Sequence, residues 1–178
     1  AAEYSAPNSS VNLTPAAISC NGPSPLILNV LRNTAFLPPA AELPGMHKKI
    51  ASFYLNAGDQ EILSVRTISL SLQSSHPVFD RVYLEDPTGR YLYGPNVPDG
   101  SGTVNFSGLN VELMRRESIA LDVFADIQAA GRGCAAGSAA AYSTKIQAGA
   151  ITGLGMASAR VLSAPVSPVG GHSGAVQC

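Results

Sequence analysis

The stretch Glu61–Ser74, EILSVRTISLSLQS, decides the fold. Its first apolar residues, Leu63 and Val65, share one parity, as in a β-strand whose alternate side chains face a core. Its later apolar residues fall on the other parity: Ile68, Leu70 and Leu72. A change of phase by one residue within a strand indicates a β-bulge. We therefore predict one long, bulged strand with one face buried.

Similar alternation recurs on both sides of this stretch. The segments that show it are IASFYL (50–55), RVYLED (81–86), RYLY (90–93), GTVNFSGLNVEL (102–113), SIALDVFADI (118–127), the run with Tyr142, Thr144 and Ile146, and MASARVLS (156–163). Turn sequences such as Asp86-Pro87-Thr88-Gly89 and Pro98-Asp99-Gly100 separate them. No window keeps a helical period, and Gly131, Gly133 and Gly137 argue for a loop in the Ala-rich stretch 129–141. The pattern predicts an all-β, antiparallel β-sandwich of seven to nine strands.

These segments, in this order, resemble an immunoglobulin-like module of bacterial cell-surface and S-layer-associated proteins. The resemblance runs from about Asn29 to Leu162 and includes IASFYLNAG and RVYLEDPTGRYLYG. It implies an extracellular sandwich and no catalytic residues. The first 28 residues, the cysteines and the loop 129–141 depart from it. We accordingly divide the chain into an N-terminal extension (1–28), an Ig-like sandwich (29–164) and a C-terminal tail (165–178).

Composition excludes several classes of protein. The chain has 178 residues, of which 46% are hydrophobic and 13% charged, and its net charge is −1. No apolar run approaches the roughly 18 residues of a membrane span, so we expect no membrane-spanning segment. The balanced charge provides no field for nucleic acid, and the apolar fraction is too high for a disordered chain.

The compartment is indicated by the start of the chain and by its cysteines. Ala1-Ala2-Glu3 is the kind of start that signal peptidase leaves, so we expect a secreted protein, extracellular or at the cell surface. The cysteines are Cys20, Cys134 and Cys178, and none belongs to a C-x-x-C pair. In an oxidising compartment we expect two of the three to form a disulfide, which leaves the third free or bonded to another chain. Cys178 paired with either Cys20 or Cys134 would fasten a tail to the sandwich, and the pairing itself stays open. An inert buried thiol is the alternative.

Charge is concentrated in the middle of the chain. Residues 46–132 hold 18 of the 23 charged side chains, whereas the last 46 residues hold only Lys145 and Arg160. Flanks with so little charge are poorly solvated unless something covers them. A polymer or a coat of glycans would cover them.

The N-terminal extension supplies a candidate cover. An extended segment can complete the open edge of a sheet in another subunit, and such head-to-tail contacts build filaments. The arrangement is similar to that of donor-strand pilins. We expect a donor within residues 8–31, whose pocket-filling side chains would be Val11, Leu13, Leu26, Leu28 and Val30. Pairing of residues 1–28 with their own sandwich remains the alternative.

The function expected from these observations is that of a structural, self-associating subunit of an extracellular filament or surface layer. Sequons at Asn8, Asn12 and Asn105 are candidates for glycosylation. We expect no enzyme activity, cofactor or metal, because there is no Gly-x-Ser-x-Gly elbow and no D-x-D-x-D-G spacing. The alternative is a monomeric adhesion or carbohydrate-binding module, with Tyr83, Tyr91 and Tyr93 as a stacking platform.

Overall fold

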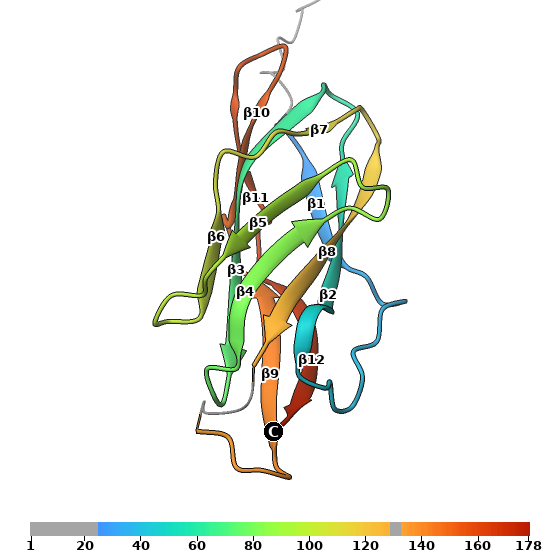
Figure 1. The fold of residues 1–178 in the computed structure, drawn as a ribbon. Helices are drawn as coiled ribbons and strands as arrows, with labels where there is room; N and C mark the ends of the chain where they lie inside the picture. Colours follow the sequence, from blue (N-terminus) through green and yellow to red (C-terminus); the bar gives the residue numbers. More distant parts are fainter. Residues whose placement is uncertain (1–24, 129–132) are drawn as a thin grey trace, which may run out of the picture.

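A computed structural model describes residues 25–128 and 133–178 of the chain. These residues form two packed antiparallel sheets of five and seven strands (Figure 1). The predicted all-β architecture is confirmed, but seven to nine strands was too low, because the described residues contain twelve. No helix within these ranges is long and apolar enough to cross a membrane.

The five-stranded sheet has β1 and β5 at its edges. Its order is β1 (Leu28–Arg32), β2 (Gly45–Ala57), β8 (Ser118–Ile127), β4 (Phe79–Glu85) and β5 (Leu92–Asn96). The alternating stretches of the sequence supply its long central strands. In β8 the side chains on one parity enter the core, while Asp122, Phe124 and Asp126 lie on the opposite parity.

The seven-stranded sheet is built around β3 (Leu63–Ser74). Its other strands are β6 (Thr103–Phe106), β7 (Val111–Leu113), β9 (Ala139–Ile146), β10 (Ile151–Gly155), β11 (Val161–Ala164) and β12 (Val169–Gln177). β6 and β7 share one side of β3, whereas β9 and β10 share the other and lead to β12 and β11. One long strand therefore organises the whole sheet.

The β-bulge predicted in β3 lies where the apolar pattern changes phase. Thr67 pairs with Thr152 and Val65 with Gly153, so Arg66 is the extra residue. The Leu109 amide donates to the Arg66 carbonyl at 2.9 Å, which fixes the bulge from the other side. A Cβ at residue 153 would lie 2.4 Å from the Ser64 carbonyl oxygen, so this close approach requires glycine.

The core lies between the two sheets. Its largest side chains are at most 2% exposed, and they include Phe53, Leu55, Ile68, Leu70, Phe106, Leu113 and Ile151. They come from both sheets and from both halves of β3. Burial of about 25 cal/mol per Å² of apolar surface is the main favourable term for such a core.

The charge-poor C-terminal flank belongs to the sandwich. Residues 165–178, expected to be a tail, contain β12, which pairs with β9 along most of its length. The sequence of β12, VGGHSGAVQ, has three glycines and no clear alternation, which is why it did not read as a strand. Likewise, MASARVLS falls across the turn and second strand of the β10–β11 hairpin.

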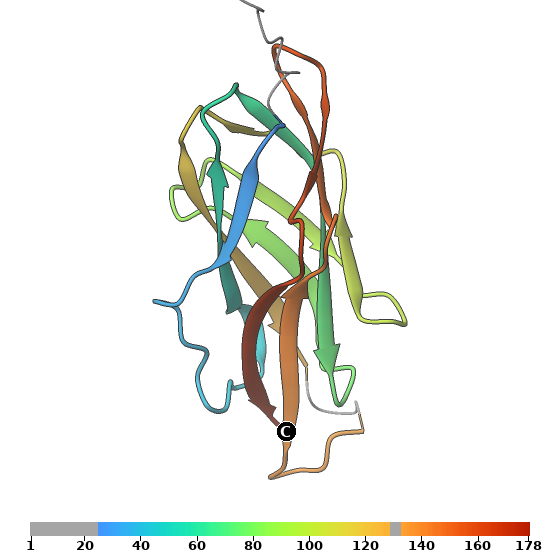
Figure 2. The ribbon, with the colours of Figure 1, turned by 180° about the vertical axis from the view of Figure 1, so that it is seen from behind.

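Residues 33–44, which we call the strap, connect β1 to β2 along the side of the sandwich. Figure 2 shows the strap near β12 as it returns toward β2. Glu42 forms a parallel bridge with Val176 of β12. The Glu42 amide donates to the Ala175 carbonyl at 2.6 Å, and the Gln177 amide donates to the Glu42 carbonyl at 2.8 Å. The strap therefore protects part of the outer edge of β12.

Candidate functional site

The outer face of the five-stranded sheet collects many of the charged side chains of the chain's middle. Strand register pairs Ser52 with Asp122 between β2 and β8, and Glu85 with Asp122 between β4 and β8. Tyr83 pairs with Phe124 on the same two strands, β4 and β8. Because residues paired across strands share a face, acidic, hydroxyl and aromatic side chains meet there.

His47 forms the first cluster on this face. Its ring stacks on Phe124, with centroids 4.5 Å apart, and meets Tyr83 edge-on at 5.1 Å. Nε2 of His47 lies 2.9 Å from Oε1 of Glu85. The backbone of His47 has φ +53°, a left-handed conformation that is uncommon for residues other than glycine. The Asp126 carboxylate stabilises this conformation by accepting a 2.9 Å hydrogen bond from the His47 backbone amide.

Asp126 also links this cluster to Tyr83. The Tyr83 hydroxyl donates to the second Asp126 oxygen at 3.0 Å. Partial burial raises the pKa of Tyr83, and the Asp126 carboxylate raises it further. The Tyr83 hydroxyl therefore stays protonated near neutral pH and is available as a hydrogen-bond donor to Asp126.

The second cluster is centred on buried Ser52 and Asp122. The Ser52 hydroxyl donates to Asp122 at 2.6 Å and accepts a hydrogen bond from the Asn33 side chain at 2.9 Å. Lys49 Nζ lies 2.6 Å from the second Asp122 oxygen. Asp122 is 5% exposed, so its carboxylate is held by two donors in a mostly dry environment.

His172 of β12 adjoins the second cluster and is fully buried. Its Nε2 lies 3.0 Å from the Ser52 carbonyl oxygen, so this nitrogen carries the proton and donates. Nδ1 is also buried and has no hydrogen-bond partner among the described residues. Burial lowers the pKa of His172, the hydrogen bond to Ser52 opposes this shift in part, and the positive charges of Arg32 and Lys49 add to the lowering.

Ser52, His172 and Asp122 do not have the geometry of a nucleophilic triad. The Ser52 hydroxyl donates directly to Asp122, while His172 contacts the Ser52 carbonyl rather than its hydroxyl. No base is therefore placed to activate the serine. Within residues 25–128 and 133–178, no group of three or more His, Cys, Asp or Glu side chains is arranged to hold a metal ion.

The expected donor residues fall into two groups. Leu28 and Val30 lie in β1, are 6% and 4% exposed, and pair with Ala57 and Leu55 of their own chain. Leu26 packs against the same core. In this structure these three residues are thus used within the chain, as in the alternative considered above. Val11 and Leu13 lie outside the described residues.

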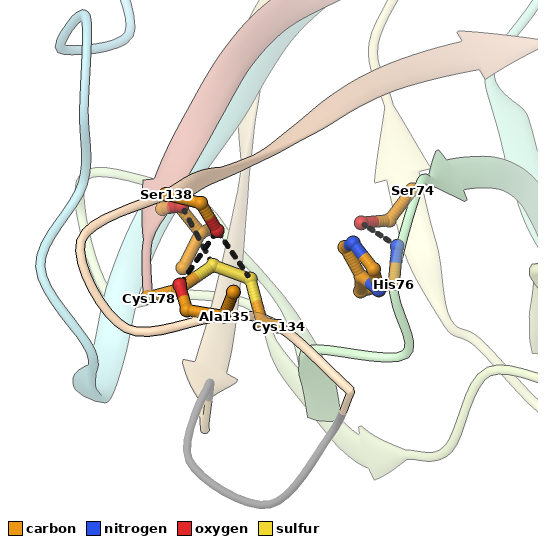
Figure 3. Close-up of a disulfide and its surroundings, with 7 residues drawn as sticks. Ser74, His76, Cys134, Ala135, Ser138 and Cys178 are labelled. Carbon is orange, nitrogen blue, oxygen red and sulfur yellow. Dashed lines mark hydrogen bonds between the residues drawn. A yellow bond between two sulfur atoms is a disulfide. The ribbon is translucent and has the colours of Figure 1, made fainter.

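The cysteines form one disulfide within the described part of the chain, between Cys134 and Cys178 (Figure 3). Their Cα atoms are 5.6 Å apart. The bond joins the loop before β9 to the end of β12, and the Cys178 amide donates to the Ser138 carbonyl at 3.0 Å. Of the two partners expected for Cys178, the structure has Cys134; Cys20 lies outside the described residues.

Among the glycosylation candidates, Asn105 is exposed on β6, where its side-chain oxygen accepts a 2.6 Å hydrogen bond from Ser69. Asn8 and Asn12 lie outside the described residues. Asn105 therefore has the surface position that a glycan requires, but its side chain also contributes to a cross-strand pair.

The three candidate tyrosines do not form one platform. Tyr83 belongs to the His47 cluster, whereas Tyr91 and Tyr93 stack on each other with centroids 6.3 Å apart. Tyr91 is 7% exposed, and its hydroxyl donates to the Glu112 carbonyl at 3.0 Å. A hollow of about 350 Å³ lies beside this pair, lined by Arg90, Tyr91, Tyr93, Asn110 and Glu112.

Sequence reasoning missed the two polar clusters because their members come from distant parts of the chain. Ser52 and His172 are 120 residues apart, and His172 was assigned to a tail. One signal was present: His172 and Val176 share a parity, which turned out to be the inward parity of β12. The three glycines around them obscured this pattern.

Comparison with known proteins gives distant likenesses in structure, which include the two solved proteins below. No family model and no curated protein matches the chain. A protein described as "AvmM Catalyzes Macrocyclization in Alchivemycin A Biosynthesis" has a TM-score of 0.39 and 11% identity, covering 86% of this chain and 89% of the other. A family 123 glycoside hydrolase from Clostridium perfringens has a TM-score of 0.33 and 7% identity, covering 84% of this chain and 27% of the other. We carry no activity over from either protein.

Proposed function

We propose that this protein is a secreted, Ig-like structural module that self-associates head to tail by β-strand addition, as the repeating subunit of an extracellular filament or surface layer. The observation that carries the proposal is the outer edge of β11. It pairs with β10 on one side only, and Val161 is 76% exposed on it. Edge strands of monomers are usually protected by charge, bulges or covering segments.

The main chain of this edge is suited to accept a strand. The Gly155 amide donates to the Arg160 carbonyl, so Gly155 and Arg160 form a hydrogen-bonded pair. In an antiparallel ladder every second residue of a strand bonds to its neighbour, so the amides and carbonyls of Val161 and Ser163 point away from β10. Just beyond the strand, Val166 is 98% exposed. Residues 133–178 contain no acidic residue and only two basic ones, so few charged side chains would have to be desolvated when an apolar strand binds there.

Residues 8–24 of a second copy are the occupant we propose. Val11 and Leu13 share a parity, so one face of an added strand would present both to the acceptor. The extension leads directly into β1, while its acceptor is a different surface, β11, which makes the contact head-to-tail. We leave Leu26, Leu28 and Val30 out of this donor, because Leu28 and Val30 lie in β1 and Leu26 packs against the core of its own chain.

Deletion and edge variants test this proposal. We expect the full chain to form concentration-dependent oligomers in light scattering and filaments in negative-stain micrographs. Deletion of residues 1–24 and Val161→Lys should each abolish them. Leu92→Lys is the matched control, because Leu92 is 68% exposed on the opposite sheet's edge, in β5. Assembly that survives both changes would refute the proposal.

A secreted location fits the disulfide. Disulfides persist in oxidising compartments and are rare in the cytosol. The Cys134–Cys178 bond is the kind of cross-link that such a compartment preserves. Peptide mapping of the native protein under non-reducing conditions tests whether the bond is present.

The hollow beside Tyr93 favours a second candidate, a glycan-binding module. Its lining combines two tyrosines with an acidic residue, an amide residue and a basic residue: Glu112, Asn110 and Arg90. Such groups stack on and hydrogen-bond to sugars. Tyr93→Ala and Glu112→Gln should then abolish binding on a glycan array, whereas Tyr54→Ala should not. The structural-subunit proposal predicts no binding that depends on these residues.

A further inference from the structure

We propose that His172 is a proton-sensitive latch for the strap, residues 33–44, and that acidification releases the strap from β12. This goes beyond the proposed function and does not depend on it. Two aromatic rings contact the His172 ring: Phe36 comes from the strap, which is not a strand, and Phe53 comes from β2.

The His172 ring is enclosed by side chains of the strap and of the strands. Phe36 of the strap meets His172 edge-on with centroids 5.0 Å apart, and Phe53 of β2 lies at 6.2 Å. The backbone amide of His172 is held by the Thr144 hydroxyl at 2.8 Å. Strand residues therefore fix the histidine, while Phe36 closes the strap side.

The hydrogen bonds of the ring allow only the neutral form inside this enclosure. Nε2 donates to the Ser52 carbonyl, which also accepts the Asn33 amide at 3.0 Å. A second proton would have to enter at Nδ1, which is buried without a hydrogen-bond partner. A buried charged donor with no acceptor is strongly unfavourable.

The surrounding charges also oppose protonation. Arg32 at the end of β1 and Lys49 of β2 are both positive, and each lowers the pKa of His172 after the larger effect of burial. Asp122 of β8 is already bound by Lys49 and Ser52. Glu42 of the strap pairs with Lys48 at 3.3 Å. The described surroundings thus give the imidazolium no free carboxylate.

Movement of the strap is the simplest way to solvate a protonated His172. Besides Phe36, the strap is attached by the bonds of Asn33 to Ser52, by those of Glu42 to Ala175 and Gln177, and by the Glu42–Lys48 ion pair. Moving any other wall would break a sheet ladder. Release would expose the outer edge of β12 near Ala175, and would loosen the connection between β1 and β2.

Hydrogen exchange on the full chain tests the latch. The amides of Glu42 and Gln177 report on the strap, because each makes a strap–β12 hydrogen bond. Between pH 7.5 and 5, after correction for intrinsic exchange, we expect their protection to fall below about pH 6.5 by up to tenfold per pH unit. In His172→Gln the exchange protection of these two amides should not change with pH. His47→Gln is the control, because the His47 side chain is 45% exposed, and protection in this variant should fall with pH as in the wild type.

Three results would overturn the latch: constant strap protection in the wild type, the same pH dependence in His172→Gln, or loss of that dependence in His47→Gln. If His172→Gln does not fold, His172→Phe replaces it as a ring that cannot titrate. NMR titration of the wild-type imidazole adds a readout that needs no variant. His172 must titrate below about 6.5, the ordinary value, together with the loss of strap protection; an ordinary titration would refute the latch.

Discussion

Breaking the Cys134–Cys178 disulfide should cost the protein a large part of its stability. The two cysteines are separated by 44 residues, and the chain-entropy relation gives about 4 kcal/mol at 25 °C for a loop of that length. The loop contains β9, β10, β11 and β12, so the unfolded chain gains freedom over nearly the whole charge-poor flank. We expect a loss of about 3–4 kcal/mol, which is large beside a typical domain stability of about 5–15 kcal/mol.

Guanidinium unfolding at pH 7, followed by tyrosine fluorescence and circular dichroism, measures this loss. The oxidised chain, the chain in reductant and the double variant Cys134→Ala/Cys178→Ala are compared. Cys20→Ala is the control and should leave the free energy of unfolding unchanged. A loss below about 1 kcal/mol in the double variant, or peptide mapping that finds Cys178 joined to Cys20, would refute the reasoning.

Three further predictions concern packing and ionisation. Gly153→Ala should destabilise the fold by about 1–3 kcal/mol, because the new Cβ would lie 2.4 Å from the Ser64 carbonyl oxygen. Gly100→Ala is the control and should cost less, because no atom lies within 4 Å of its Cβ position. Equal losses of stability in the two variants would contradict the bulge geometry. Asp122→Ala should cost about 1–3 kcal/mol in chemical denaturation, because it removes the acceptor of the partly exposed Lys49 and of the buried Ser52 hydroxyl. A change below about 0.5 kcal/mol would show that these contacts are not formed. Burial raises the pKa of Tyr142 to about 12, so the protonated hydroxyl adds to the free energy of unfolding below pH 10, and this contribution is lost as pH rises toward 12. Tyr142→Phe should therefore reduce the loss of stability in alkaline unfolding curves. A curve that is unaltered by the substitution would refute the assignment.

The sheets could be predicted where alternation was strong. In β3 the change of phase at Arg66 predicted the bulge that the register shows. The number of strands could not be predicted, because short strands such as β10, ITGLG with five residues, show too little of a period and lie outside the alternating segments. β12 was missed for a different reason: its glycines lack side chains, so tertiary pairing with β9 determines its conformation.

The polar clusters were beyond reach of the sequence because their chemistry is created by long-range contacts. Asp122 could be placed on a strand from its alternation, but nothing local indicated that Lys49 and Ser52 would hold it. His172 looked like a residue of a flexible tail, yet it is fully buried against β2. Its ionisation depends on this burial, which no single-sequence pattern encodes.

Addition of a synthetic peptide of residues 1–24 to a chain that lacks them tests the central claim most directly. The peptide should bind to the truncated chain and shift the NMR amide signals of Val161 and Ser163, and Val161→Lys should abolish both effects. Absence of binding, or binding that shifts other strands and leaves β11 unchanged, would contradict strand addition at this edge.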